Sequence, residues 1–193
     1  MDMTAVRLEA PATPTAPALL LRPWTQADAT ALVELHRDAM LRRWTSAAVD
    51  DEEGAAHWVR VQQRGWAARD RFAFAVLETR ADGADGLPAG HVVLKRPVAG
   101  AASAEVGYWT AAPARGRAVA PRALRALVDW AFAAFAADGL TRLGLLHQQD
   151  NTASCRVAQK AGFAFTAPRP AAPPAFPLDG HLHTLVREQR PKI

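Results

Sequence analysis

Residues 105–120 read EVGYWTAAPARGRAVA, and this stretch decides the fold. An apolar strand runs into a loop of small residues, which leads into a long apolar helix that we expect over residues 121–137. Small side chains let a ligand approach the main chain, and the first N–H groups of a helix have no acceptor within it. The stretch therefore predicts a phosphate-binding loop, with Arg115, Arg117 and Arg122 adding positive charge. An ordinary tight turn before a helix is the alternative interpretation.

The loop differs from the two common nucleotide-binding fingerprints. No Gly-Lys-Ser/Thr follows it, as a Walker loop requires, and the three glycines of the dinucleotide fingerprint are missing. The phosphate group that this loop would bind therefore belongs to another class of ligand.

Outward from the loop, the spacing of apolar residues alternates between strands and helices. Residues 1–18 are rich in proline and alanine and predict a flexible leader, and residues 19–190 predict a single domain. Strands are expected near residues 19–21, 72–77, 91–94, 104–109, 142–147, 163–165 and 181–186, and helices near residues 25–40, 50–66, 121–137 and 152–160. The order predicts a mixed α/β (α+β) fold, with a central sheet of about six to seven strands flanked by about four helices.

The composition narrows the class of protein. The chain has 193 residues, of which 50% are hydrophobic and 22% charged, so disordered, collagen-like and disulfide-stapled chains are excluded. No apolar run approaches the roughly 20 residues that span a bilayer, and no secretory signal is evident. Together with the single cysteine, these features predict a cytoplasmic protein. The net charge of +4 favours an anionic ligand without naming it.

Two motifs carry a family resemblance. Residues 115–120, RGRAVA, resemble the acyl-CoA pyrophosphate loop of the GNAT N-acetyltransferase superfamily, whose pattern is Gln/Arg-x-x-Gly-x-Gly/Ala. Residues 151–163, NTASCRVAQKAGF, resemble its second hallmark. The likeness extends over residues 19–186 and is nearest to the ribosomal-protein N-terminal acetyltransferase branch. The family's first loop glycine falls at Ala118, where a positive φ would cost alanine roughly 1 kcal/mol.

The resemblance implies acetyl-CoA as co-substrate and direct attack by an amine in a ternary complex. A main-chain N–H near residues 109–111 would stabilise the oxyanion. The cofactor-binding residues that the resemblance implies are Trp109, Thr110, Ala111, Arg115, Gly116, Arg117, Ala118, Val119, Ala120 and Asn151.

Two catalytic residues are implied in the same way. Glu105 matches the strand that carries the general base in several relatives, and a surface carboxylate or salt-bridge partner is the alternative. Ser154 matches a serine near the sulfur that can donate to the leaving thiolate, and a hydroxyl bonded to its own helix backbone is the alternative. Tyr108 is a further candidate acid, although strand alternation points it away from Glu105.

Other side chains have weaker signals. Trp44 and Trp66 lie in the segment that lines the acceptor pocket in relatives, with core packing as the alternative for each. His181 and His183 share one face of a strand, but no third ligand of suitable spacing is evident, so we expect no metal site. Cys155 has no histidine among its sequence neighbours and predicts a buried helix residue.

These features predict an acetyl-CoA-dependent N-acetyltransferase acting on a primary amine: a protein N-terminus, a small amine metabolite or an antibiotic. A non-catalytic α/β module that senses CoA or binds nucleic acid is the alternative. The arginines are spread along the chain and form no basic-aromatic platform, so neither a nucleic-acid nor a membrane partner is expected. The resemblance is compatible with a homodimer.

Overall fold

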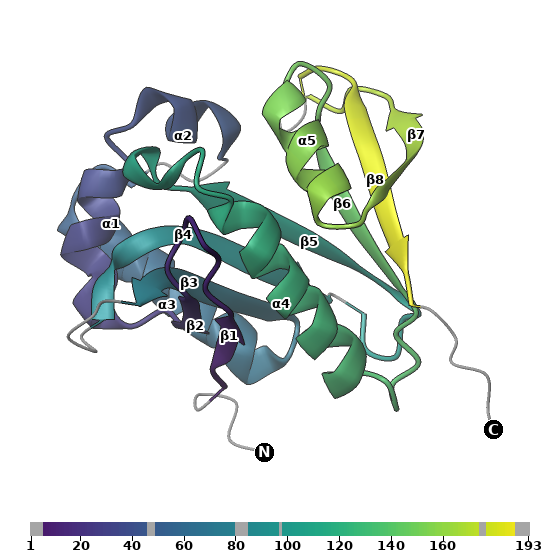
Figure 1. The fold of residues 1–193 in the computed structure, drawn as a ribbon, viewed down its shortest axis with the longest axis horizontal. Helices are drawn as coiled ribbons and strands as arrows, with labels where there is room; N and C mark the ends of the chain where they lie inside the picture. Colours follow the sequence, from purple (N-terminus) through teal and green to yellow (C-terminus); the bar gives the residue numbers. More distant parts are fainter. Residues whose placement is uncertain (1–5, 46–48, 80–84, 97, 174–176, 188–193) are drawn as a thin grey trace.

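A computed structural model describes residues 6–45, 49–79, 85–96, 98–173 and 177–187. In this part of the chain the strands form one eight-stranded sheet with the order β1-β2-β3-β4-β5-β6-β8-β7 (Figure 1). The strands are β1 (Leu8–Ala10), β2 (Leu19–Pro23), β3 (Arg71–Thr79), β4 (Asp85–Lys95), β5 (Ser103–Thr110), β6 (Arg142–Gln148), β7 (Ala164–Arg169) and β8 (Gly180–Val186). Only β5 and β6 pair in parallel. The mixed sheet confirms the predicted fold class.

Helices cover both faces of the sheet. They are α1 (Ala29–Leu35), α2 (Ala39–Trp44), α3 (Glu52–Ala68), α4 (Val119–Ala134) and α5 (Thr152–Lys160), with short 3-10 turns η2 (Gln26–Asp28) and η3 (Ala112–Ala114). Strand β3 is apolar on both sides: its phenylalanines pack in the cluster that includes α4, and its alanines in the cluster that includes α1 and α3. No described helix is long and apolar enough to span a membrane.

The sheet splits between β5 and β6. These strands pair only from Ser103 to Val106, opposite residues 142–145 of β6, and then diverge (Figure 1). Beyond the split, β6, α5, β7 and β8 form a separate unit, which we call the C-terminal arm. The split opens a gap in the hydrogen-bonded ladder beside the second half of β5.

The structure differs from the sequence prediction in the leader. Three residues of the expected flexible segment 1–18 form strand β1, which pairs antiparallel with β2. The guanidinium of Arg122 donates to the carbonyls of Pro11 and Pro17 at 2.6 and 2.7 Å, which ties this segment to α4. Residues 1–5 lie outside the described part of the chain. The extra strand explains why the sheet has eight strands rather than six to seven.

Two further boundaries were wrong. The single helix expected over residues 25–40 is broken after Leu35, and a second helix starts where the Asp38 carboxylate accepts from the Leu41 N–H at 2.7 Å. An aspartate that caps a helix in this way marks the start of a new helix. The spacing of the apolar residues does not show this break, because it continues across it. Strand β7 extends to Arg169, four residues past the strand expected over residues 163–165.

Candidate active site

The main chain of β5 presents free hydrogen-bonding groups toward the split. In an antiparallel strand, the N–H and C=O of one residue both point to one neighbouring strand, and those of the next residue point to the opposite side. The N–H of Ala111 donates to the Ala89 carbonyl at 2.9 Å, which sets Trp109 and Ala111 facing β4. Tyr108 and Thr110 therefore face the side that β6 has left. Of the donors expected near residues 109–111, Ala111 is occupied, and Thr110 is the one directed toward the gap.

The loop before α4 has the backbone geometry of an anion site. Gly116 has φ +78° and Ala118, the residue before the helix, has φ +56°, so the alanine does stand at a left-handed position. No side chain caps the helix, and the N–H groups of residues 116–120 have no hydrogen-bond acceptor within the described chain. A row of unpaired N–H groups at the positive end of a helix dipole binds phosphate well. The geometry fits the oxygens of a phosphate or diphosphate group.

Two loop arginines are held by acidic residues outside the loop. Arg115 donates to both carboxylate oxygens of Asp38 at 3.2 and 2.5 Å, and this hydrogen bond lowers the pKa of Asp38. Arg117 lies 3.0 Å from the carboxylate of Glu78. Both arginines stay about 40% exposed, so each borders the loop without blocking its N–H groups (side-chain exposures 39% and 43%).

Tyr108 and Ser154 meet across the split. The Tyr108 hydroxyl from β5 lies 2.8 Å from the Ser154 hydroxyl on α5, and either group can donate. Burial raises the pKa of Tyr108, and the hydrogen bond to Ser154 opposes part of that shift. The Ser154 hydroxyl thus bonds Tyr108 rather than its own helix backbone. Asn151 positions this serine, because its side-chain oxygen accepts from the Ser154 N–H at 3.2 Å and caps α5.

Glu105 lies on the opposite face of β5, together with Gly107 and Trp109. Its side chain is 48% exposed and its carboxylate is 2.6 Å from the Lys95 ammonium. The carboxylate is therefore not buried, and the observed contact is that of the salt-bridge partner given as its alternative. In the strand register, Arg71 of β3 lies opposite Lys95 of β4, and Lys95 lies opposite Glu105 of β5. The three side chains therefore form a row across three adjacent strands on one face of the sheet.

A cavity of about 660 Å³ opens on the same face as Glu105. Its wall consists of the first half of α3, with Asp51, Glu53 and Trp58 among the lining residues, and of Arg71 from β3. Arg71 and Glu105 stand two strands apart, so their main chains lie roughly 10 Å apart across the sheet. The phosphate loop and the split thus lie on one side of β5, and the open cavity lies on the other.

The sequence matches the profile of the GNAT acetyltransferase domain over residues 18–164. The chain belongs to the GNAT acetyltransferase family. The family resemblance and the enzyme class predicted from the two motifs are thereby confirmed. No curated protein matches the sequence significantly.

Solved structures share the GNAT fold over nearly the whole chain. A protein provisionally described as a ribosomal-protein-serine acetyltransferase from Vibrio cholerae superposes with a TM-score of 0.76, at 22% identity over 95% of this chain and 98% of that one. Mycobacterium smegmatis RimJ, in complex with CoA-disulfide, has a TM-score of 0.77 at 21% identity over 97% and 88%. The microcin C7 self-immunity acetyltransferase MccE, in complex with acetyl-CoA and AMP, has a TM-score of 0.73 at 16% identity. The match covers 90% of this chain and 97% of that one.

The two tryptophans expected in the acceptor pocket of this GNAT protein lie apart from the cavity wall. Trp66 is 4% exposed, donates its indole N–H to the Ala73 carbonyl at 3.0 Å and packs against Phe72, which is the core role given as its alternative. It also borders a separate cavity of about 220 Å³. Trp44 ends α2, half-buried, with the Arg43 guanidinium 4.7 Å from its ring.

A different aromatic group backs the larger cavity. Trp58 lines the cavity and packs edge-on against Trp24, with ring centroids 5.2 Å apart. Behind them lies His91, which accepts a hydrogen bond from the Trp24 indole at 3.0 Å and stacks on Trp109. Burial is the main cause that holds the pKa of His91 well below its ordinary value. Periodicity alone did not mark Trp58, because it lies at the border of the apolar stripe of α3.

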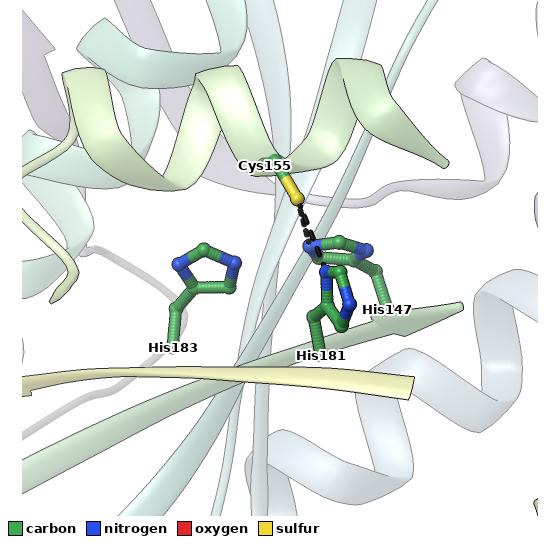
Figure 2. A group of neighbouring side chains, drawn as sticks. All are labelled: His147, Cys155, His181 and His183. Carbon is green, nitrogen blue, oxygen red and sulfur yellow. Dashed lines mark hydrogen bonds between the residues drawn. The ribbon is translucent and has the colours of Figure 1, made fainter. Parts of the chain in front are cut away.

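The structure also groups four side chains that the sequence kept apart. His147 and Cys155 lie beside His181 and His183 in the C-terminal arm, and the Cys155 sulfur is 3.5 Å from His147 Nε2 and 3.4 Å from His181 Nδ1 (Figure 2). The pair of strand histidines was recognised, but the other two members come from different elements. Cys155 therefore does have histidine neighbours in space.

Proposed function

We propose that this protein transfers the acetyl group of acetyl-CoA to the α-amino group of a peptide or protein N-terminus, by direct attack in a ternary complex. The observation that carries the proposal is the split beside β5, where free main-chain groups lead from Tyr108 to the unpaired N–H groups before α4. A ligand with an extended amide-containing arm and a diphosphate fits this path.

The residues that would hold acetyl-CoA lie on the α4 and α5 side of the sheet. The N–H groups of residues 116–120 would bind its diphosphate, with Arg115 and Arg117 adding charge. The open edge of β5 at Tyr108 and Thr110 would pair with the pantetheine arm as an added strand. The free side-chain N–H₂ of Asn151 would donate to the same arm. When bound, acetyl-CoA supplies the activated thioester.

Groups at the split would protonate the leaving thiolate and stabilise the charge of the oxyanion. One of the two N–H groups on this edge, that of Tyr108 or that of Thr110, would stabilise the oxyanion, and the other would pair with the pantetheine arm. The Tyr108–Ser154 pair would give a proton to the leaving thiolate, because both hydroxyls are protonated at neutral pH and one can relay through the other. This arrangement needs no covalent enzyme intermediate.

The exposed position of Glu105 favours an acceptor that loses its proton easily. A peptide α-amino group has a pKa of about 7.7–8.0, whereas a lysine side chain has about 10.4. A solvated carboxylate acting through water can assist the first, but it is poorly suited to the second. The cavity wall carries Asp51 and Glu53 but also Arg60 and Arg71, so a cationic N-terminus would be held by local contact with the acidic pair and not by an overall negative charge. Glu105 would act as base only through a relay of water molecules, because it lies three and five residues along β5 from Tyr108 and Thr110, roughly 10 and 16 Å.

The experiment combines calorimetry and thiol release. Acetyl-CoA is titrated into the protein, and thiol release is then followed with peptides that carry a free N-terminus, with the same peptides blocked at the N-terminus but carrying lysine, and with small amines. We expect binding heat, and turnover with free N-termini at least tenfold above that with blocked peptides. Absence of binding heat at high protein concentration would remove the proposal.

A CoA sensor without transferase activity is the second candidate, and the solvent exposure of Glu105 is the observation that favours it. The same experiment separates the two. A sensor gives binding heat but no acceptor-dependent thiol release with any member of the amine panel.

A further inference from the structure

Three elements of the C-terminal arm direct nitrogen and sulfur ligands to one point. His181 and His183 share a face of β8, and His147 of β6 pairs directly opposite His181. Helix α5 lies over this face and brings Cys155 down onto the imidazoles (Figure 2). One ligand atom from each of the four residues lies within 4.8 Å of all the others.

His183 shows that the cluster lacks a partner. Its side chain is 1% exposed, and neither of its ring nitrogens has a hydrogen bond of acceptable geometry within the described chain. A buried ring nitrogen without a partner is unfavourable. The ring stacks on His147 with centroids 5.2 Å apart, so both imidazoles present their edges to the same space.

The ligand set identifies the class of metal. Three imidazoles and one thiolate suit zinc and related late transition metals, whereas magnesium and calcium need oxygen ligands, which the cluster does not contain. In a tetrahedral zinc site with Zn–N and Zn–S bonds of about 2.0–2.3 Å, the ligand atoms lie roughly 3.3–3.6 Å apart. The two sulfur–nitrogen distances of 3.5 and 3.4 Å already match this spacing. The widest separation needs to close by roughly 1 Å, which rotation of a side chain supplies.

We propose that His147, Cys155, His181 and His183 bind one Zn²⁺ ion in the interior of the C-terminal arm. The ion would cross-link β6, α5 and β8, and it would give the buried His183 a partner. The arm joins the rest of the sheet through only a short run of β5–β6 pairing, so a cross-link there would stabilise the part of the molecule that carries Ser154. The cluster lies beside the Tyr108–Ser154 pair, because Cys155 follows Ser154 on α5, but the metal-binding proposal does not depend on the function proposed for that pair.

The test uses tag-free protein stripped with a chelator and then titrated with Zn²⁺. We expect one ion per chain, and a rise in Tm of roughly 5–10 °C when free Zn²⁺ reaches a hundredfold excess over Kd. Co²⁺ in place of Zn²⁺ should give the intense visible absorption of a tetrahedral site and a thiolate charge-transfer band.

Variants decide whether these four residues hold the metal. Cys155→Ser should abolish the charge-transfer band, and both Cys155→Ser and His181→Ala should weaken Zn²⁺ binding at least tenfold. Both replace half-buried side chains, and circular dichroism checks their folding. His57→Ala, which removes an exposed histidine of α3, is the matched control and should bind like the parent. Zn²⁺ binding that survives in both cluster variants, or no rise in Tm with the parent, overturns the site.

Discussion

The hydroxyl groups of Tyr108 and Ser154 lie 2.8 Å apart, and this contact bridges the two halves of the split sheet. Tyr108 belongs to the last residues of β5 before the phosphate loop, and Ser154 to the first turn of α5. The serine is 7% exposed, and burial raises the pKa of the tyrosine. The pair is therefore a protonated, partly desolvated donor between the two motifs that define the family.

Loss of either hydroxyl should slow turnover without weakening binding. We expect Tyr108→Phe and Ser154→Ala each to lower kcat about 100-fold, the size of a typical general-acid contribution, with little change in KM for acetyl-CoA. The double variant should fall no more than about threefold below the slower single variant, because groups that act as a unit are not additive. Thiol release at saturating acetyl-CoA measures these values. A parallel loss of acetyl-CoA affinity would assign the pair to binding instead.

Two substitutions of Asn151 should separate its role as the cap of α5 from its role in ligand binding. Asn151→Ala removes the cap of α5 and should cost about 1 kcal/mol of stability in urea unfolding. Asn151→Asp keeps an oxygen that caps the helix and should retain stability, but it loses the side-chain N–H₂. In calorimetry, this variant should bind acetyl-CoA about three- to tenfold more weakly, the value of one hydrogen bond. Unchanged affinity in the aspartate variant would restrict Asn151 to its structural role.

Glu105→Gln tests the water-assisted base through the pH dependence of the rate. At pH 7 the variant should acetylate an N-terminal peptide about tenfold more slowly, and near pH 9 the defect should disappear, because the α-amine with a pKa of about 8 is then neutral without help. Its stability should change by less than about 1 kcal/mol, because the ion pair with Lys95 is exposed. A rate equal to that of the parent at every pH leaves Glu105 as a salt-bridge residue only.

The sequence predicted the parts of the molecule that depend on local pattern. The strand over residues 72–77, the small-residue loop before α4 and the helix over residues 152–160 all follow from nearest neighbours along the chain, and each stands where it was expected. Even the left-handed conformation of Ala118 could be anticipated from the glycine pattern that it replaces.

What could not be predicted depends on which strands become neighbours. His147 meets His181 only because β8 inserts between β6 and β7, and nothing in the spacing of the histidines encodes that order. Strand β1 is three residues long, too short to show alternation. Glu105 was placed on the correct face, but its exposure depends on what α3 leaves uncovered, and that is a tertiary property.

Substitutions at the two left-handed residues of the loop before α4, Gly116 and Ala118, should have opposite effects on stability. Ala118→Gly removes a chirality penalty of roughly 1–2 kcal/mol and adds back somewhat less than 1 kcal/mol of unfolded-chain entropy, so stability should stay equal or rise slightly. Gly116→Ala introduces the same penalty at a position where nothing blocks the added Cβ, and it should cost about 1 kcal/mol. Both are measured by urea unfolding. Strong destabilisation of Ala118→Gly would show that the alanine methyl packs usefully.

Buried histidines should make the protein less stable in mild acid. Burial, with the nearby charges of Arg71 and Lys95, lowers the pKa of His91, and burial also lowers that of His36. The Nδ1 of His91 accepts from the Trp24 indole, so a proton at that nitrogen would break a buried hydrogen bond. In the unfolded chain both histidines have a pKa near 6.5 and take up protons below it, whereas in the folded protein they resist protonation.

The folded state therefore binds fewer protons than the unfolded state below about pH 6.5, and stability must fall as the pH decreases through that value. A histidine that stays neutral in the folded protein contributes up to about 1.4 kcal/mol per pH unit below pH 6.5, and we expect His91, whose pKa is lowered further, to contribute more than His36. Urea unfolding in the presence of a chelator measures the slope without any contribution from bound metal. His91→Asn should flatten it, and His57→Ala, which removes an exposed ring, should not. A stability that is constant or rises as the pH falls from 6.5 to 5 would contradict neutral, buried imidazoles at both positions.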